Sequence, residues 1–305
     1  MTIRYDDKVA LVTGAGGGLG RSHAIELAKR GAKVVVNDLG GSVSGEGANS
    51  QASLDVLAEI EDLGGEAMAH GANVADLEQV QDMVEQTMDR WGRLDILVNN
   101  AGILRDKSFS KGSVEDFRLV ADVHLMGTVH CTKVCWDIMK EQEYGRIVVT
   151  SSSSGLYGNF GQTNYGAAKM GVIGMMNTLA QEGAKYNVKI NALAPTAGTR
   201  MTEGLMDEKA FALLTPETVT PAVLYLVSED APTRTILAAG AGSFAVAKIV
   251  ETEGMWLPEA EQTPEGIATH WGHISEGGER ALQAGFEQSI KMVGQAAKGL
   301  GLDMD

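Results

Sequence analysis

Residues 13–20 read TGAGGGLG and decide the fold class, because they join a segment of strand character to one of helical character. The apolar run KVALV at 8–12 precedes them, and LGRSHAIELAKR at 19–30 follows them. Gly14, Gly18 and Gly20 let the backbone turn tightly and approach a phosphate, while the start of the helix offers free N–H groups and the positive end of its dipole. The stretch therefore predicts a dinucleotide-binding loop.

The alternation of strand and helix continues along the chain. Short apolar, β-branched runs without polar alternation are typical of strands buried on both faces of a parallel sheet. We therefore predict an α/β fold with a doubly wound parallel sheet (Rossmann fold), whose ligands bind beyond the carboxyl ends of the strands. Strands are predicted within 8–12, 33–38, 66–74, 93–102, 145–153 and 188–195, and helices over 19–30, 76–91, 113–141 and 163–185.

The remaining segments follow this pattern less clearly. Residues 40–50, GGSVSGEGANS, read as a flexible glycine-rich insertion after the second strand. Beyond residue 216 we predict a helix over 216–230, one last strand within 238–250 and a polar helical tail from about 265. Since no linker marks a second domain, we expect one domain over residues 1–260 and a C-terminal helical extension, 261–305, packed on it.

Composition excludes several classes of protein. The chain has 305 residues, of which 44% are hydrophobic and 21% charged, an ordinary globular balance. Neither a secretory signal nor an apolar run of about 18 residues is present, so we expect no membrane association. A formal charge of −15 argues against a nucleic-acid partner, although a few local Arg or Lys residues still allow an anionic substrate.

The cysteines and histidines of the sequence favour a reducing compartment and argue against a metal-binding site. Cys131 and Cys135 are the only cysteines, so disulfides do not hold the fold, which suits the cytoplasm. The two lie one helical turn apart without further ligands, and His270 and His273 lack a third ligand at a suitable spacing. We therefore expect no metal site.

Asp38 and the NNAG stretch at 99–102 supply further polar groups at the predicted carboxyl edge of the sheet. Asp38 ends the second strand, about 20 residues beyond the glycine-rich loop, where a carboxylate accepts both hydroxyls of an adenosine ribose and repels a 2′-phosphate. This favours NAD over NADP, with a helix-capping or solvated aspartate as the alternative. The small residues and amides of NNAG suit a turn facing the cofactor, although alone they fit any Asn-Gly loop.

Tyr165 and Lys169 lie four residues apart in a stretch of helical character and therefore share a face. A free phenol titrates near pH 10, and a neighbouring cation is expected to lower that pKa. The pair would then exchange a proton with a hydroxyl or carbonyl oxygen while hydride moves to or from a nicotinamide. Taken alone, Tyr165 and Lys169 would be interpreted as surface residues. The serines at 151–154 and the glycine-rich loop instead favour a catalytic role for the pair.

Together these motifs resemble the short-chain dehydrogenase/reductase superfamily. TGAGGGLG matches its Thr-Gly-x-x-x-Gly-x-Gly loop, NNAG its Asn-Asn-Ala-Gly, and Ser152, thirteen residues before YGAAK, its Ser…Tyr-x-x-x-Lys. The resemblance implies that Ser152 holds the substrate oxygen, that Tyr165 is the acid/base, and that Lys169 tunes Tyr165 and binds the nicotinamide ribose. It assigns the cofactor to Thr13, Gly14, Gly18, Leu19, Gly20, Asp38, Asn73, Val74, Asn100, Ala101, Gly102, Tyr165, Lys169, Pro195, Thr196 and Thr199.

Two positions depart from the family pattern. His124 stands where the family often has an Asn that completes a proton relay; it is either a candidate relay or a buried structural imidazole. Pro195-Thr196 replaces the usual Pro-Gly after the sixth strand.

Longer strings, such as NNAGILRDKSF and APTAGTRMT, resemble the (3R)-hydroxyacyl-CoA dehydrogenase branch that occurs in peroxisomal multifunctional enzymes and as free-standing bacterial enzymes. The resemblance implies a free-standing, NAD-dependent oxidation of a 3-hydroxyacyl-CoA, either fatty or with a steroid side chain, by a homodimer or homotetramer. Three alternatives stay open: a hydroxysteroid or other secondary alcohol without CoA, a ketoacyl carrier-protein reductase, and a non-catalytic NAD-binding redox sensor. Arg105, Lys107 and Lys111 are either contacts for CoA phosphates or solvated surface charges.

Overall fold

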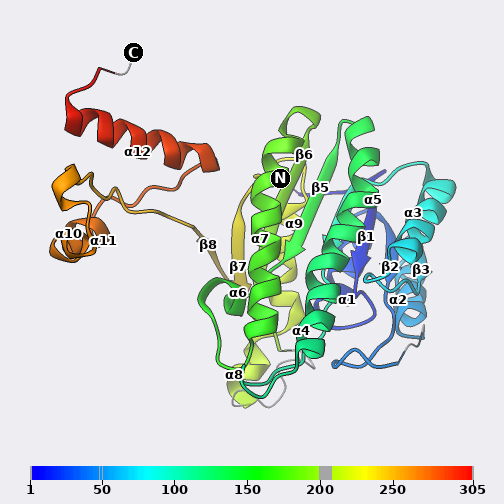
Figure 1. Cartoon of the computed structure of the whole chain (residues 1–305). Helices are drawn as coiled ribbons and strands as arrows, with labels where there is room; N and C mark the ends of the chain where they lie inside the picture. Colours follow the sequence, from blue (N-terminus) through cyan, green and yellow to red (C-terminus); the bar gives the residue numbers. More distant parts are fainter. Residues whose placement is uncertain (1, 48, 50, 199–207, 304–305) are drawn as a thin grey trace. The chain divides into compact units, whose positions relative to one another are not determined.

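The computed structural model describes residues 2–47, 49, 51–198 and 208–303 (Figure 1). The chain divides into two compact units, Met1–Val246 and Ala247–Asp305. The division lies earlier than the predicted boundary at residue 260, and the packing of 261–305 on the same domain stays a prediction. No helix among the described residues is long and apolar enough to cross a bilayer.

The first unit is built on a sheet with the strand order β3-β2-β1-β4-β5-β6-β7-β8. Each pair from β3 to β7 is parallel, and Val12 of β1 lies opposite both Val36 and Val98. The chain therefore winds outward in both directions from β1, which confirms the predicted doubly wound sheet and places a crevice beyond the carboxyl ends of β1 and β4. The strands are β1 (Val9–Thr13), β2 (Lys33–Asn37), β3 (Ala67–His70), β4 (Ile96–Asn99), β5 (Gly145–Thr150), β6 (Val188–Pro195), β7 (Ile236–Gly240) and β8 (Ser243–Ala247).

Helices cover both faces of this sheet, which is why every residue of β1, β4 and β5 is buried (Figure 1). On one face α1 (Gly18–Lys29) packs against α2 (Gln51–Asp62) and α9 (Thr220–Leu226). On the other, α3 (Leu77–Trp91) packs against α5 (Gly127–Glu141), and α4 (Val114–Ala121) packs against α7 (Thr163–Gly183). Shorter elements are α6 (Ser153–Tyr157), η2 (Ala184–Tyr186), α8 (Glu208–Leu213) and η3 (Pro216–Thr218).

Several predicted elements need correction. The predicted helix over 113–141 contains a π-helical turn, η1 (Asp122–Met126), between α4 and α5. The single strand expected within 238–250 is two strands, β7 and β8, separated by Ala241 and Gly242, which both have positive φ. The helix expected over 216–230 is the 3₁₀ turn η3 followed by the short α9, and α2 was not predicted as an element.

The second unit, described by itself, has helical elements that all begin after residue 258. It contains η4 (Glu259–Glu261), α10 (Pro264–Thr269), α11 (Trp271–Ser275) and α12 (Gly285–Leu300). Lys291 of α12 donates to the carbonyl of Thr252 at 2.9 Å, and Glu251 and Arg280 exchange two backbone hydrogen bonds. These bonds tie the extended residues 251–253 to the helical part of the unit.

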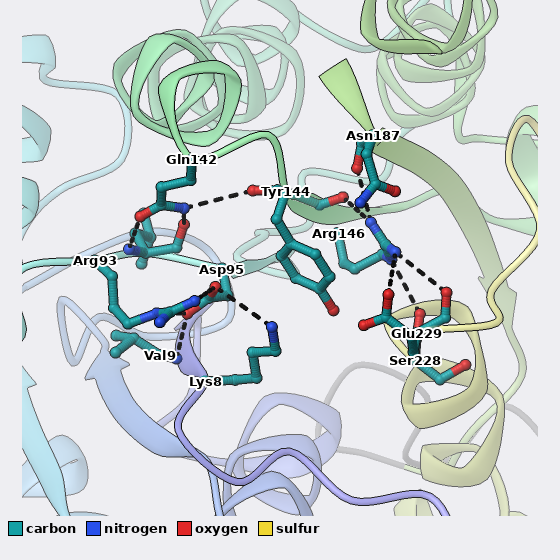
Figure 2. A network of polar contacts seen from close by, with 12 residues as sticks. Lys8, Val9, Arg93, Asp95, Gln142, Tyr144, Arg146, Asn187, Ser228 and Glu229 are labelled. Carbon is teal, nitrogen blue, oxygen red and sulfur yellow. Dashed lines mark hydrogen bonds and ion pairs between the residues drawn. The ribbon is translucent and has the colours of Figure 1, made fainter. Parts of the chain in front are cut away.

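A polar network fixes the amino edge of the sheet, opposite the crevice (Figure 2). Asp95, fully buried before β4, accepts from the N–H of Val9 in β1 at 2.9 Å and from Arg93 at 2.6 and 2.8 Å. Arg146, fully buried in β5, donates to the carbonyls of Gly145, Asn187, Ser228 and Glu229 at 2.8–3.2 Å. A buried guanidinium is tolerated only when its donors are satisfied, and here they join β5 to the start of β6 and the end of α9.

Arg146→Met should lower the free energy of unfolding by about 3 kcal/mol, because it leaves several buried carbonyls without a donor. Arg21→Met is the matched control: it removes a partly exposed ion pair with Glu59 and should cost less than about 1 kcal/mol. Urea unfolding of both variants measures the difference. Equal losses would show that the Arg146 network contributes no more than a surface pair.

Candidate active site

The loops after β1 and β4 lie against each other, and Thr13 holds them together. Its Oγ1 accepts the N–H groups of Asn100 at 3.0 Å and Ala101 at 3.1 Å. The Asn100 side chain returns two bonds, to the carbonyls of Thr13 at 3.0 Å and Gly14 at 3.1 Å. At Gly14, where φ is +64°, a Cβ would lie 2.8 Å from the Cα of Ala101, so the motif needs glycine there.

This junction forms the floor of a cleft at the carboxyl edge of the sheet. Of the predicted cofactor residues, Gly14, Gly18, Leu19, Asp38, Asn73, Val74, Asn100, Ala101 and Gly102 line it. Thr13 and Gly20 support it from below; a Cβ at Gly20 would lie 2.1 Å from the carbonyl oxygen of Gly14. Pro195 and Thr196 lie at and after the end of β6, and Thr199 lies outside the described residues.

The donor and acceptor groups of the cleft suit a dinucleotide. Glycines at the start of α1 leave room for a pyrophosphate beside the helix N-terminus. Asp38 lies directly after β2, and its two carboxylate oxygens accept the N–H groups of Gly16 at 2.8 Å and Gly40 at 2.7 Å. A carboxylate oxygen has a second lone pair, so both remain able to accept a ribose hydroxyl.

Part of the cleft wall was not predicted from the sequence. The glycine-rich insertion, expected to be flexible, contributes Leu39, Gly41, Ser42, Val43 and Gly45, and the apolar residues Ile103, Leu119 and Val123 complete the wall. The apolar spacing of Leu119 and Val123 on one helix face was the available signal.

Ser152, Tyr165 and Lys169 come together where β5 ends and α7 begins. The Ser152 hydroxyl lies close enough to the phenol of Tyr165 to lower its pKa. Lys169 is 3% exposed; its Nζ donates to the carbonyl of Thr150 at 2.6 Å and lies 5.5 Å from the centre of the Tyr165 ring. The three side chains therefore lie together where β5 ends and α7 begins.

The four consecutive serines have four different surroundings. Ser151 donates to the carbonyl of Lys169 at 2.8 Å and fastens α7 to β5, whereas Ser153 is exposed. Ser154 donates to Gln162 at 2.7 Å and orders the loop before α7. Of the four, Ser152 is the one that influences the pKa of Tyr165, and its hydroxyl also accepts the N–H of Ser154 at 3.2 Å.

Burial dominates the protonation of this group. It raises the pKa of the Tyr165 phenol, which the hydrogen bond from Ser152 opposes and the carboxylate of Asp106 reinforces. Burial also lowers the pKa of the Lys169 ammonium to about 7. The lowering of the Tyr165 pKa expected from a nearby cation is therefore outweighed, within the chain, by desolvation.

His124 lies in the π-helical turn, beneath Tyr165. Its Nε2 is 3.0 Å from the N–H nitrogen and 2.7 Å from the carbonyl oxygen of Ile103, and its ring meets that of Tyr165 edge to face at 5.0 Å. A Cβ at Gly102 would lie 2.3 Å from the imidazole, so this glycine leaves room for the ring. Burial, and then the charge of Lys169, lower the pKa of His124 well below its usual value, so the ring is neutral at pH 7.

Arg105 and Lys107, considered for CoA phosphates, are engaged by the chain itself. Arg105 Nη2 lies 3.3 Å from Glu46 and Nη1 3.6 Å from Asp116, and Lys107 lies 3.2 Å from Asp116. These ion pairs favour a structural use of both cations.

Comparison with known proteins fits this geometry. The sequence model for short chain dehydrogenases matches residues 8–210. The chain belongs to the short-chain dehydrogenase family. It is 47% identical over 277 residues to peroxisomal multifunctional enzyme type 2 of Mus musculus, covering 90% of this chain and 37% of that enzyme. It is 41% identical over 231 residues to 3-oxoacyl-[acyl-carrier-protein] reductase of a Synechocystis species, covering 73% of this chain and 90% of the reductase.

Two solved structures extend the comparison. Full-length peroxisomal multifunctional enzyme type 2 from Drosophila melanogaster is 39% identical and superposes with a TM-score of 0.82 over 98% of this chain and 51% of that chain. 7α-Hydroxysteroid dehydrogenase, in complex with NADH and 7-oxo glycochenodeoxycholic acid, is 27% identical, with a TM-score of 0.71 over 79% of this chain and 95% of that one. The short-chain dehydrogenase family is one of oxidoreductases, and the second of these solved structures contains bound NADH.

The low pKa of Lys169 gives a prediction for stability against pH. Folded Lys169 releases its proton near pH 7, whereas an unfolded lysine keeps it to about 10.4. The unfolded state therefore binds more protons between these values, and this contribution to the unfolding free energy rises with pH. Relative to Lys169→Met, the wild type should gain roughly 1 kcal/mol per pH unit between about pH 7.5 and 9.5.

Urea unfolding without added cofactor measures this difference. Lys111→Met, which removes an exposed lysine, is the control, and its difference from the wild type should stay constant over the same range. A constant difference for Lys169→Met as well would contradict the low pKa.

Proposed function

We propose that the chain oxidises a (3R)-hydroxyacyl-CoA to the 3-ketoacyl-CoA with NAD. The observation that carries the proposal is the contact of Ser152 with the Tyr165 phenol above the buried Lys169, in a short-chain dehydrogenase with 47% identity to a peroxisomal multifunctional enzyme. The oxidation removes a hydride from carbon 3 and a proton from its hydroxyl, so that the carbon becomes a ketone.

We assign each of the three side chains a role in this reaction. Ser152 donates to or accepts from the substrate oxygen and holds it beside the phenol. Tyr165 takes the hydroxyl proton, and Lys169, when charged, stabilises the phenolate that must form first. A bound oxidised nicotinamide supplies the hydride acceptor and a second positive charge. His124, neutral and edge-on to Tyr165, keeps the ring in place; its part in a proton relay stays a prediction.

Asp38 supports NAD as the cofactor. Its carboxylate lines the cleft and accepts two backbone N–H groups. A 2′-phosphate placed beside it would meet a like charge in a partly desolvated site, whereas ribose hydroxyls would donate to its free lone pairs.

The acyl substrate is supported by the names of two relatives. One is a peroxisomal multifunctional enzyme and the other a 3-oxoacyl-[acyl-carrier-protein] reductase, whose name specifies a thioester with oxygen on carbon 3. The similarity to 7α-hydroxysteroid dehydrogenase keeps a free hydroxysteroid as the second candidate. Cytoplasmic location and a homodimer or homotetramer belong to this proposal, and the two buried, unpaired cysteines accord with a reducing compartment.

Tyr165→Phe should lower kcat by about 10³-fold, because it removes the proton acceptor and keeps the shape of the ring. Binding of the dinucleotide, measured by fluorescence titration, should change little. Tyr157→Phe is the matched control, since Tyr157 is 75% exposed eight residues earlier, and its kcat should equal that of the wild type. Full turnover by Tyr165→Phe would exclude this mechanism, and dinucleotide binding without turnover of any alcohol by the wild type would favour the redox-sensor alternative.

Steady-state kinetics with matched substrates tests the function itself. We expect kcat/KM for (3R)-hydroxyacyl-CoA thioesters to exceed that for the (3S) epimers, free hydroxysteroids and acyl carrier-protein thioesters by at least about tenfold, with NAD preferred over NADP. A preference for free hydroxysteroids would replace the CoA proposal with the second candidate. A preference for NADPH and a carrier-protein thioester would identify a reductase instead.

A further inference from the structure

The insertion after β2 forms an ordered strap, which we define as residues 39–47. Within it, the N–H of Ser42 donates to the carbonyl of Glu46 at 2.8 Å, and the N–H of Gly45 donates to that of Ser42 at 2.9 Å. The Ser42 hydroxyl also accepts the N–H of Glu46 at 3.1 Å. These bonds close a tight turn within the strap.

The start of the strap is joined to the glycine-rich loop through Asp38. One carboxylate oxygen accepts the N–H of Gly40, in the strap, and the other accepts that of Gly16, in the glycine-rich loop. The strap therefore begins next to Asp38, whose carboxylate would accept the ribose hydroxyls. Five residues of the strap line the cleft.

The far side of the strap crosses the cleft and docks on the segment that follows NNAG. The N–H of Leu104 donates to the carbonyl of Val43 at 2.9 Å. Gly45, with φ +83°, lies so close to Ile103 that a Cβ would come within 3.1 Å of its side chain. The cleft is thus bridged by backbone from the insertion, which rests on the opposite wall.

Arg105 provides the side-chain part of this docking. Its Nε donates to the carbonyl of Ser44 at 2.7 Å, and its Nη2 reaches the carboxylate of Glu46 at 3.3 Å. The side chain is only 25% exposed, so these charge-assisted bonds are partly shielded from water. Arg105 holds the strap at two successive points, which a single ammonium cannot do with the same geometry.

The same segment connects to the catalytic residues. The carbonyl of Arg105 accepts from the Asn164 side chain at 3.1 Å, and Asn164 Oδ1 accepts the N–H of Tyr165 at 2.7 Å. Ile103, two residues earlier, is held by His124. A change in the strap therefore reaches the start of α7 through two hydrogen bonds.

We propose that Arg105 is a positioning residue that latches the strap across the dinucleotide cleft and slows release of the cofactor. The latch contacts the strap, not the reacting atoms, and it acts by limiting how often the cleft opens. The inference rests on the nicotinamide cofactor of the family and is independent of which alcohol is oxidised.

Displacement kinetics test the latch directly. Whichever of NADH and NADPH binds the wild type more tightly is bound first, and its fluorescence is followed in a stopped-flow instrument after an excess of the oxidised form is added. Arg105→Ala should release it about tenfold faster, the loss expected for charge-assisted bonds worth roughly 1.4 kcal/mol. Arg105→Lys, which keeps the charge but loses the Nε bond to Ser44, should fall between the two.

Lys107→Ala is the matched control, because Lys107 shares the partner Asp116 with Arg105, and Asp116 lies outside the strap. Its release rate should equal that of the wild type. Glu46→Gln changes the exposed strap residue that pairs with Arg105, and it should speed cofactor release about two- to threefold. This variant tests the same contact if Arg105→Ala folds poorly.

Hydrogen exchange of the protein without cofactor gives a second readout. Amides of residues 42–46 should exchange at least severalfold faster in Arg105→Ala than in the wild type or Lys107→Ala, with the rest of the sheet unchanged. Unchanged release and unchanged strap exchange in Arg105→Ala would overturn the proposal. Equal acceleration of cofactor release in Lys107→Ala and Arg105→Ala would also overturn it. That result would assign the effect to the positive charge of residues 105–107 rather than to the contacts of Arg105 with the strap.

Discussion

The site depends on the close approach of two backbone loops beyond β1 and β4. Thr13 satisfies the N–H groups of Asn100 and Ala101, and Asn100 satisfies the carbonyls of Thr13 and Gly14. Because these polar groups are partly buried, the loops have to meet in one register or leave several hydrogen bonds unmade. The cleft floor, the segment at 103–107 and the placement of His124 all follow from this junction.

The two edges of the sheet have different roles: the amino edge fixes the strands, and the carboxyl edge forms the cleft. At the amino edge, Asp95 and Arg146 bind the starts of β1, β4, β5 and β6 into a fixed register with buried, fully used charges. The carboxyl edge does not rely on these buried charges, and its glycines, amides and hydroxyls face the cleft or one another. A rigid edge thus supports an edge where reacting groups are placed to within hydrogen-bond distances.

The sequence was informative wherever a local pattern determines the outcome. The β1 loop and the burial of the strands follow from strand and helix periods, whereas the choice of Ser152 among four serines came from the resemblance to the short-chain dehydrogenase motif. The π-helical turn does not follow from these periods, because no Gly or Pro interrupts residues 114–126. Its His124 contacts Ile103, 21 residues earlier, which no local pattern reveals. The contacts of the strap could not be predicted for the same reason: its partners, Leu104 and Arg105, lie about 60 residues away, and composition alone does not reveal them.

Asp38 links cofactor choice to the shape of the loops. A variant designed to accept a phosphorylated ribose would replace its carboxylate, yet both oxygens of that carboxylate also receive N–H groups, from Gly16 and from Gly40. A serine or threonine would present one oxygen for two separate donors, and an alanine none. Under the proposed use of NAD, a change of cofactor preference would therefore require coordinated changes in two loops, the glycine-rich loop after β1 and the segment after β2, rather than one substitution.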